Sequence, residues 1–218
     1  MQFHCDAVLF DLDGVLVDSR QVIRRHWTKW CAQQGMDVEK VLDVAHGRRP
    51  ADTVRLLLPD ADNADELAEQ IVAGEASDAE GLIHLPGVKA LIGSLQDAKW
   101  TVATSGPRAI AEFRLRFAGV PIRNTMVTAE DVTRGKPDPE PYLLAAQKLQ
   151  VPADRCIVFE DAPPGVQAGR AAGAQVIGLS TTHSVAELLA AGANTVIDNL
   201  SCIAAQVAAD GSITFTTS

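Results

Sequence analysis

The sequence has little cysteine and no long apolar run. Its four cysteines are far apart and form no CxxC pair, which argues against a disulfide framework and against a structural zinc site. No run approaches the roughly 20 apolar residues that a membrane-spanning helix needs. The first residues, MQFHCDAVLF, lack the basic start and long apolar core of a secretion signal. We therefore expect a cytoplasmic protein.

Positive charge is also scarce. The chain has 19 lysine and arginine residues against 28 aspartate and glutamate residues, which gives a net charge of −9 and leaves no basic stretch. Nucleic-acid backbones and anionic membrane surfaces attract clustered positive charge, so we expect neither as a partner. A length of 218 residues is enough for one core domain and a small second one. A monomer is the default expectation.

Short runs rich in valine, isoleucine and leucine recur along the chain. They do not alternate with polar residues, which is typical of strands buried on both faces of a parallel sheet. The predicted strands are Ala7–Phe10, Thr101–Ala103, Thr125–Val127, Ile157–Phe159, Gln175–Leu179 and Thr195–Ile197. The helical patterns between them are Arg108–Ala118, Glu140–Leu149, Gly165–Ala172 and Val185–Ala191. This alternation predicts an α/β fold with a Rossmann-like, doubly wound parallel sheet.

The segment after the first strand departs from this alternation, because it has no convincing strand. Its helical patterns are 19–34, 37–46, 51–58 and 64–79. These helices could simply pack on the sheet, but ordinary connections between a strand and a helix are short. We therefore predict an all-helical cap at 17–85 and an α/β catalytic core formed by 1–16 and 86–218. Beyond Ser201 the pattern predicts only a last strand near Thr214.

The most informative segment is AVLFDLDGVLVDS, residues 7–19. Asp11 and Asp13 follow a buried strand and are two residues apart, so an extended backbone points both carboxylates to one side. Adjacent carboxylates repel each other unless a cation or a proton relieves the repulsion. Gly14 permits the sharp turn that follows. The alternative is a loop with two solvated acids, since aspartate is common in loops.

The segment VATSG ends another apolar strand. Thr104 offers a hydroxyl, and Ser105 and Gly106 offer backbone amides at the start of the next helix. Free amides at a helix N-terminus bind phosphate readily. The alternative is an ordinary helix N-cap.

Two further segments add charged groups. Lys136 lies between a glycine and a proline in RGKPDPEPY, and a braced ammonium is useful where anions meet. Glu160 and Asp161 end the strand in IVFEDAPPG. The alternatives are a mobile surface lysine and an N-cap aspartate. All four segments lie at carboxyl ends of predicted parallel strands, where open α/β sheets bind ligands, and together they supply a nucleophile, a proton carrier, an anion site and metal ligands.

The four segments resemble, in order, the motifs of the haloacid dehalogenase superfamily, and the resemblance spans nearly the whole chain. The stretches most similar to its glycerol-1-phosphatase and sugar-phosphatase branch are HGRRPADTV (46–54), KWTVATSG (99–106), GKPDPEPYL (135–143) and VFEDAPPGVQAGRAAGA (158–174). The resemblance implies a Mg²⁺-dependent phosphomonoesterase that acts through an aspartyl-phosphate intermediate. The implied substrates are small phosphorylated metabolites such as glycerol phosphate, hexose phosphates and deoxy-sugar phosphates.

The resemblance also implies catalytic roles. Asp11 would attack phosphorus, and Asp13 would protonate the leaving alcohol and then activate water. Lys136 would balance the charge of Asp11 and phosphate. At ~4 Å and an effective dielectric near 20, each pair of unit charges costs roughly 4 kcal/mol, so such positive partners are needed.

The implied ligands fall into two sets. The metal ligands are Asp11, the backbone carbonyl of Asp13, and Asp161, with Glu160 as a ligand or behind one. The phosphate ligands are Thr104, Ser105 and Gly106.

The resemblance places the substrate contacts of the cap in HGRR. His46 matches the histidine of a His-Gly pair in the phosphatase branch, and Arg49 matches an arginine whose planar fork can bond hydroxyls or phosphate. We expect Arg48 and Arg55 to be solvated instead. A cap of this size would shield the site from bulk water, which favours small substrates over proteins.

The nearest alternative is a phosphoglucomutase of the same superfamily. It shares the four motifs, and Val15 follows DxDG here as it often does in mutases. The mutase pattern also has a histidine four residues after the position of Ser19, whereas this chain has Ile23 there and His26 further on. A haloacid dehalogenase would lack the second acid, Asp13.

Two non-enzymatic readings remain. A binding module that kept the fold would be expected to lose at least one of the four central charged residues, and none is missing. A scaffold could use Trp27 and Trp30 to bind a partner, but their spacing favours packing inside the cap.

Overall fold

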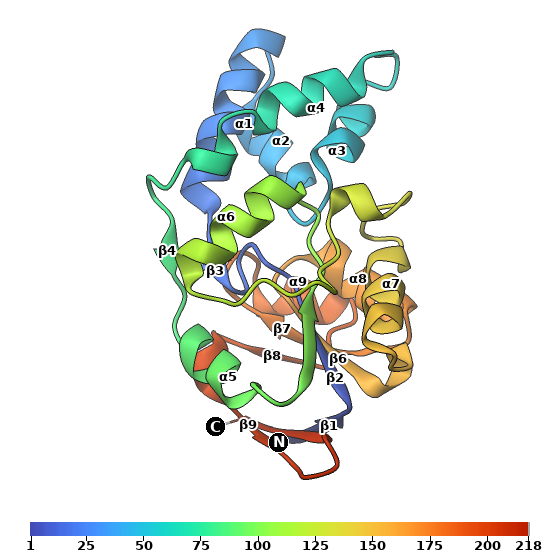
Figure 1. The fold of residues 1–218 in the computed structure, drawn as a ribbon. Helices are drawn as coiled ribbons and strands as arrows, with labels where there is room; N and C mark the ends of the chain where they lie inside the picture. The colour runs from blue at the N-terminus through green and yellow to red at the C-terminus, as the bar shows by residue number, and fades with distance from the viewer. Residues whose placement is uncertain (218) are drawn as a thin grey trace.

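The computed structural model describes residues 1–217. Its centre is a five-stranded parallel sheet with the order β5-β2-β6-β7-β8 (Figure 1). The strands are β2 (Ala7–Phe10), β5 (Lys99–Val102), β6 (Cys156–Glu160), β7 (Gln175–Leu179) and β8 (Thr195–Ile197). Counted along the chain this order is 2-1-3-4-5, one of the common doubly wound arrangements. The predicted fold class is confirmed.

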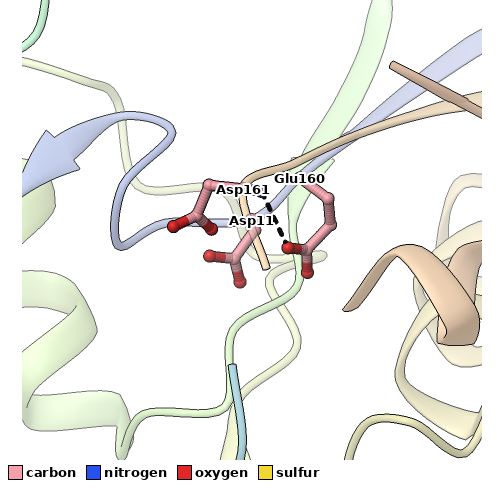
Figure 2. Close-up of side chains that lie close together, drawn as sticks. All are labelled: Asp11, Glu160 and Asp161. Carbon is pink, nitrogen blue, oxygen red and sulfur yellow. Dashed lines mark hydrogen bonds between the residues drawn. The ribbon is translucent and has the colours of Figure 1, made fainter. Parts of the chain in front are cut away.

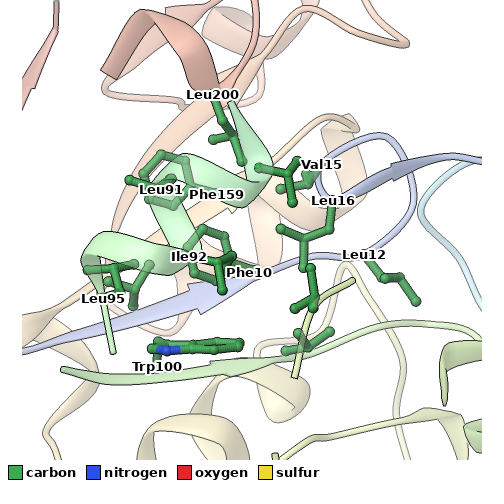
Figure 3. Packing of buried hydrophobic residues seen from close by; sticks show 14 of the residues in the cluster. Phe10, Leu12, Val15, Leu16, Leu91, Ile92, Leu95, Trp100, Phe159 and Leu200 are labelled. Carbon is green, nitrogen blue, oxygen red and sulfur yellow. The ribbon is translucent and has the colours of Figure 1, made fainter. Parts of the chain in front are cut away.

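Helices cover both faces of this sheet. One face carries α7 (Glu140–Leu149), α8 (Pro163–Ala171) and α9 (Val185–Ala190), and the other carries α5 (Val88–Ser94) and α6 (Arg108–Ala118). Successive residues of β2 point to opposite faces of the sheet. Leu9 belongs to the apolar cluster under α7, α8 and α9, and Phe10 belongs to the cluster under α5 and α6. Phe10 stacks on Phe159 at 5.2 Å and meets Trp100 edge-on at 6.0 Å (Figure 3). Packing on both faces of the sheet therefore holds β2 and β6, and with them their carboxyl ends, in a fixed position.

One predicted strand does not form. Val127 makes only an isolated bridge to Ala103, and the chain then enters a short 3-10 helix, η2 (Ala129–Asp131). A capping box between Thr128 and Asp131 starts that helix immediately after the apolar run. This capping box turns the backbone away from the sheet, so β5 remains its edge strand.

Two small antiparallel sheets complete the structure. The first pairs β1 (Gln2–Cys5), β10 (Ile213–Thr217) and β9 (Ile203–Val207), so the strand predicted near Thr214 is present. The second pairs β3 (Val17–Asp18) with β4 (Ile83–His84). This pair joins the two chain segments that lead into and out of the helical region.

Four helices fill the segment between β3 and β4. They are α1 (Arg20–Gln34), α2 (Val38–Ala45), α3 (Pro50–Leu57) and α4 (Ala64–Val72), followed by the 3-10 helix η1 (Glu75–Ser77). They share an apolar cluster of their own, in which Trp27 and Trp30 pack edge-on at 5.5 Å. In Figure 1 they lie beyond the carboxyl ends of the parallel strands. We propose that residues 17–85 form a separate cap, and "the cap" below means these residues.

Two details of the helices differ from the sequence patterns. The helix predicted over 64–79 ends at Val72, because Gly74 interrupts it before η1. Helix α5 was not among the predicted elements. Within residues 1–217, the structure contains no helix with the length and apolar character to cross a membrane.

Candidate active site

Three carboxylates meet where strand order changes direction. Asp11 follows β2, Glu160 is the last residue of the neighbouring strand β6, and Asp161 comes directly after it (Figure 2). The Asp11 amide donates to the Phe159 carbonyl at 3.0 Å, so the end of β2 is fixed against β6. One carboxylate oxygen from each acid lies within 4.8 Å of the others, and all three side chains are buried. Ligands of doubly wound sheets bind at this switch point.

The ammonium of Lys136 lies among these acids. It donates to Asp11 Oδ1 at 2.6 Å, to Glu160 Oε1 at 2.7 Å and to the Ala103 carbonyl at 3.0 Å. Burial alone would lower the pKa of Lys136, but the facing carboxylates of Asp11 and Glu160 raise it above its usual value. The lysine therefore stays charged.

Glu160 is fully occupied by protein donors. Its Oε1 accepts from Lys136 and from the Tyr142 hydroxyl, the latter at 2.7 Å, and its Oε2 accepts from the Asp161 and Ala162 amides at 3.0 and 3.2 Å. A Cβ at Gly165 would lie 1.7 Å from Glu160 Oε1, so the helix α8 leaves room for this carboxylate. Glu160 thus anchors Lys136 and the start of α8, and has no oxygen free for a metal.

Asp11 and Asp161 each keep one oxygen free. Asp11 Oδ2 and Asp161 Oδ1 accept no hydrogen bond from residues 1–217, whereas Asp161 Oδ2 accepts from Thr182 Oγ1 at 2.5 Å. Burial, together with the neighbouring carboxylates, raises the pKa of Asp11 to about 7 although Lys136 opposes the shift. Burial and the charges of Glu160 and Asp11 likewise raise the pKa of Asp161. Two free, crowded carboxylate oxygens fit a hard divalent cation such as Mg²⁺.

Asp13 lines the same cavity but has different partners. Its Oδ1 accepts from Ser19 Oγ at 2.6 Å and from the Arg114 guanidinium at 2.8 Å, and Arg114 also pairs with Glu75. The sequence reasoning missed Arg114 and Glu75. One signal was available, because Arg114 lies on the apolar stripe of α6 beside Leu115, where a lone charge would be costly.

The loop after β5 offers two unused donors. The Thr104 hydroxyl accepts from the Gly106 amide at 3.1 Å, and its own proton has no acceptor among residues 1–217. The Ser105 amide makes no hydrogen bond within that range, while its hydroxyl donates to the Gly47 carbonyl at 2.9 Å. The Arg108 amide at the start of α6 donates to Glu130 rather than into the cavity.

The two neighbouring arginines of the cap loop point to different places. Arg49 pairs with Asp52 at 2.7 Å and donates to the carbonyls of Val132 and Thr133 at 2.9 and 2.8 Å, so the structure does not bring it to the cavity. Arg48, which we expected to be solvated, is half-buried and lines the cavity. It has no side-chain ion pair or hydrogen bond with residues 1–217.

His46 also lines the cavity, beside His183 of the core. The two rings meet edge-on with centroids 5.6 Å apart. Burial and the neighbouring His183 lower the pKa of His46, so its ring is neutral near pH 7. A Cβ at Gly47 would lie 2.9 Å from the Ala162 Cβ, which shows how closely this loop approaches the core.

The cavity between cap and core has a volume of about 80 Å³. Three of the four sequence segments line it, through Asp11, Asp13, Thr104, Ser105, Gly106 and Asp161, whereas Lys136 and Glu160 are not part of its wall. The cap contributes Ile23, Trp27, Val72 and the loop that contains His46. The site is therefore covered by the cap, with polar groups on the core side and a mixed wall opposite.

A family model described as haloacid dehalogenase-like hydrolase matches residues 5–173. The chain belongs to this family. It is 42% identical over 180 residues to hexitol phosphatase A of Escherichia coli (strain K12), a match that covers 81% of this chain and 83% of that protein. It is 34% identical to glycerol-1-phosphate phosphohydrolase 2 of Saccharomyces cerevisiae over 89% of this chain and 82% of the other.

The solved structures agree with this assignment. A hydrolase from Pseudomonas syringae superposes with a TM-score of 0.81 at 29% identity, covering 90% of this chain and 94% of the other. The expected family and enzyme class are confirmed. In this haloacid dehalogenase-like hydrolase, the structure gathers the predicted core residues and His46 around the cavity but leaves Arg49 outside it.

Proposed function

We propose that this hydrolase is a Mg²⁺-dependent phosphomonoesterase that acts on small sugar or polyol phosphates through an aspartyl-phosphate intermediate. The observation that carries the proposal is the buried ammonium of Lys136, held by Glu160 and directed at Asp11 beside a free carboxylate oxygen of Asp161. This arrangement keeps a carboxylate nucleophile next to a fixed cation. The names of the two curated relatives support the same substrate class.

In the first step, the Thr104 hydroxyl and the Ser105 amide hold the phosphate oxygens. Lys136, whose donors already bond Asp11, Glu160 and the Ala103 carbonyl, balances the charge of Asp11 and the phosphate. The Asp11 carboxylate attacks phosphorus, the ester bond between phosphorus and the leaving oxygen breaks, and Asp13 gives that oxygen its proton. The products are a free alcohol and phosphorylated Asp11.

The second step regenerates the enzyme. A water molecule gives a proton to Asp13 while its oxygen bonds to phosphorus, and the bond between Asp11 and phosphorus breaks. Inorganic phosphate leaves, Asp11 is again a carboxylate, and Asp13 is again protonated. The same side chain thus serves as acid and then as base.

Asp11 and Asp161, with the backbone carbonyl of Asp13, would hold the magnesium ion. Bound there, Mg²⁺ supplies positive charge that offsets the repulsion between a carboxylate and a phosphate dianion. Glu160, whose oxygens are already used, would act through Lys136 rather than as a ligand.

The cap residues that line the cavity favour a small, hydroxylated substrate. Ile23, Trp27 and Val72 of the cap form one wall of the cavity, so a protein segment would have to displace the cap to reach Asp11. Arg48 offers hydrogen-bond donors that no residue in 1–217 accepts, and Trp27 adds an apolar side chain to the wall. A polyol or sugar presents both hydroxyls and C–H surface, so we propose that Arg48 bonds its hydroxyls.

The wall of the cavity favours hydrolysis over mutase chemistry. Ile23 lines it at the position where the resemblance placed the histidine of mutases. His26 is turned away, with Nε2 3.1 Å from Asp78. Water is therefore the proposed phosphoryl acceptor.

The direct test is a panel of small phosphorylated metabolites, assayed for phosphate release with Mg²⁺ and with a chelator. We expect Mg²⁺-dependent release, highest for polyol or sugar monophosphates, and none above background from Asp11→Asn. Chelator-resistant turnover, or an active Asp11→Asn enzyme, would refute the proposal.

A further inference from the structure

Arg114 occupies a position where helix α6 otherwise packs into the core. Only 2% of its surface is exposed, and its neighbours on the same stripe, Ala111, Leu115 and Ala118, are buried apolar residues. A buried guanidinium is costly unless its charge is paired and its N–H groups are bonded. Its partners therefore indicate why it is there.

Those partners come from opposite parts of the molecule. One terminal nitrogen donates to Asp13 Oδ1 at 2.8 Å, and the other forms an ion pair with Glu75 Oε2. Glu75 is 4% exposed and belongs to η1, on the segment that returns from the cap to the core. The three side chains thus form a continuous bridge from the cap, through Arg114, to the acid that handles the proton.

A second donor acts on the same oxygen of Asp13. Ser19 stands at the N-cap of α1, yet it makes no side-chain cap bond and instead donates to Asp13 Oδ1 at 2.6 Å. A serine at that position ordinarily accepts from a helix amide, so its hydroxyl has been diverted. With two donors on Oδ1, the orientation of the carboxylate is fixed, and Oδ2 accepts no hydrogen bond from residues 1–217.

We propose that Arg114 is a positioning residue for Asp13, and that Glu75 holds Arg114 in place when η1 of the cap is seated against α6. The bridge aims the free oxygen of Asp13 at the leaving oxygen of the substrate. The inference rests on the proposed function, because it needs Asp13 to transfer a proton. A bridge that only joined cap to core would affect stability and substrate binding without regard to the leaving group.

The test compares two substrates on purified full-length protein. Glycerol phosphate has a poor leaving group that needs a proton, whereas the p-nitrophenolate of p-nitrophenyl phosphate leaves without one. The variants are Arg114→Met, Arg114→Lys and Glu75→Gln. Arg116→Met is the matched control, because Arg116 is on the same helix, its side chain is 64% exposed, and within residues 1–217 it forms an ion pair only with Glu112.

We expect Arg114→Met to lower kcat for glycerol phosphate about 100-fold, the effect of misplacing a catalytic group by about an ångström, with KM changed less than about 3-fold. With p-nitrophenyl phosphate the variant should show a burst of one equivalent of p-nitrophenolate, because the first step needs no acid while the second still needs a base. Arg114→Lys should recover part of kcat, and Glu75→Gln should lose about 10-fold in the same pattern.

Loss of Arg114 leaves the buried Glu75 and the half-buried Asp13 without a counter-charge, so Arg114→Met could fail to fold. In that case two other variants test the inference. The double variant Arg114→Met/Glu75→Gln removes both charges of the Arg114–Glu75 ion pair, and Glu75→Gln alone removes only the negative one. Equal losses on both substrates without a burst, or unchanged kcat in a folded variant, would overturn the inference alone. An unsubstituted enzyme without phosphatase activity would overturn the proposed function first, before any variant is compared.

Discussion

The Nζ of Lys136 lies 2.6 Å from Asp11 Oδ1, and this one ammonium faces three buried carboxylates. Glu160 takes up part of its charge, since it lies 2.7 Å from the same nitrogen. The cluster therefore carries more negative charge than Lys136 can balance. A divalent cation between Asp11 and Asp161 would remove the deficit, and the stability of the protein should report its binding.

Removal of one of these carboxylates should have opposite effects with and without metal. Without metal, Asp161→Asn should raise Tm, because burial and Asp11 and Glu160 disfavour the ionised Asp161 side chain. With Mg²⁺, the unsubstituted protein should gain Tm and the variant should gain almost none. Thermal unfolding in chelator and in saturating Mg²⁺ measures both.

Asp154→Asn is the control for that experiment, because Asp154 is exposed and does not belong to the carboxylate cluster. It should behave as the unsubstituted protein in both conditions. An Asp161→Asn protein that still gained the full stabilisation from Mg²⁺ would rule out Asp161 as a ligand.

Arg48 should govern affinity for the alcohol part of the substrate. Arg48→Ala should raise KM for a polyol phosphate by about 10-fold, the value of one or two hydrogen bonds, and should leave p-nitrophenyl phosphate nearly unchanged. Arg55→Ala is the control, since Arg55 pairs with Asp65 at 2.7 Å away from the cavity. Equal effects of Arg48→Ala on both substrates would contradict the assignment.

The half-buried His46 predicts a pH dependence of stability. Burial, and next the nearby His183, lower its pKa below the ordinary 6.5. The folded protein therefore binds this proton less readily than the unfolded chain, so the stabilisation is present above pH 6.5 and is lost as pH falls through the lowered pKa. His46→Gln should flatten that part of the curve of Tm against pH, and an unchanged curve would exclude His46 as its origin.

The positions of the proposed catalytic acids and of Lys136 could be predicted from the sequence, because each belongs to a local sequence pattern. Asp11 and Asp13 follow one apolar strand, Glu160 and Asp161 lie at the end of another, and parallel strands bring their carboxyl ends to one edge. Their partners depended on tertiary structure. Glu75 and Arg114 lie on different elements and meet only when the cap is seated, so no local pattern pairs them.

The two arginines of the cap loop show a second limit. Arg48 and Arg49 are adjacent and chemically identical, and only the path of the loop decides which one enters the cavity. Thr125–Val127 shows a third, since its apolar run fits a strand but a capping box directly after it ends the pairing at a single bridge.

The most direct test of the whole account is rapid acid quench during turnover, followed by peptide mass spectrometry. The proposed mechanism predicts one phosphoryl group on the peptide that contains Asp11, located on that side chain, labile to alkali and absent from Asp11→Asn. Two results would contradict this mechanism. One is turnover with no phosphorylated peptide under quench conditions that preserve an aspartyl phosphate, and the other is a phosphoryl group on any other residue.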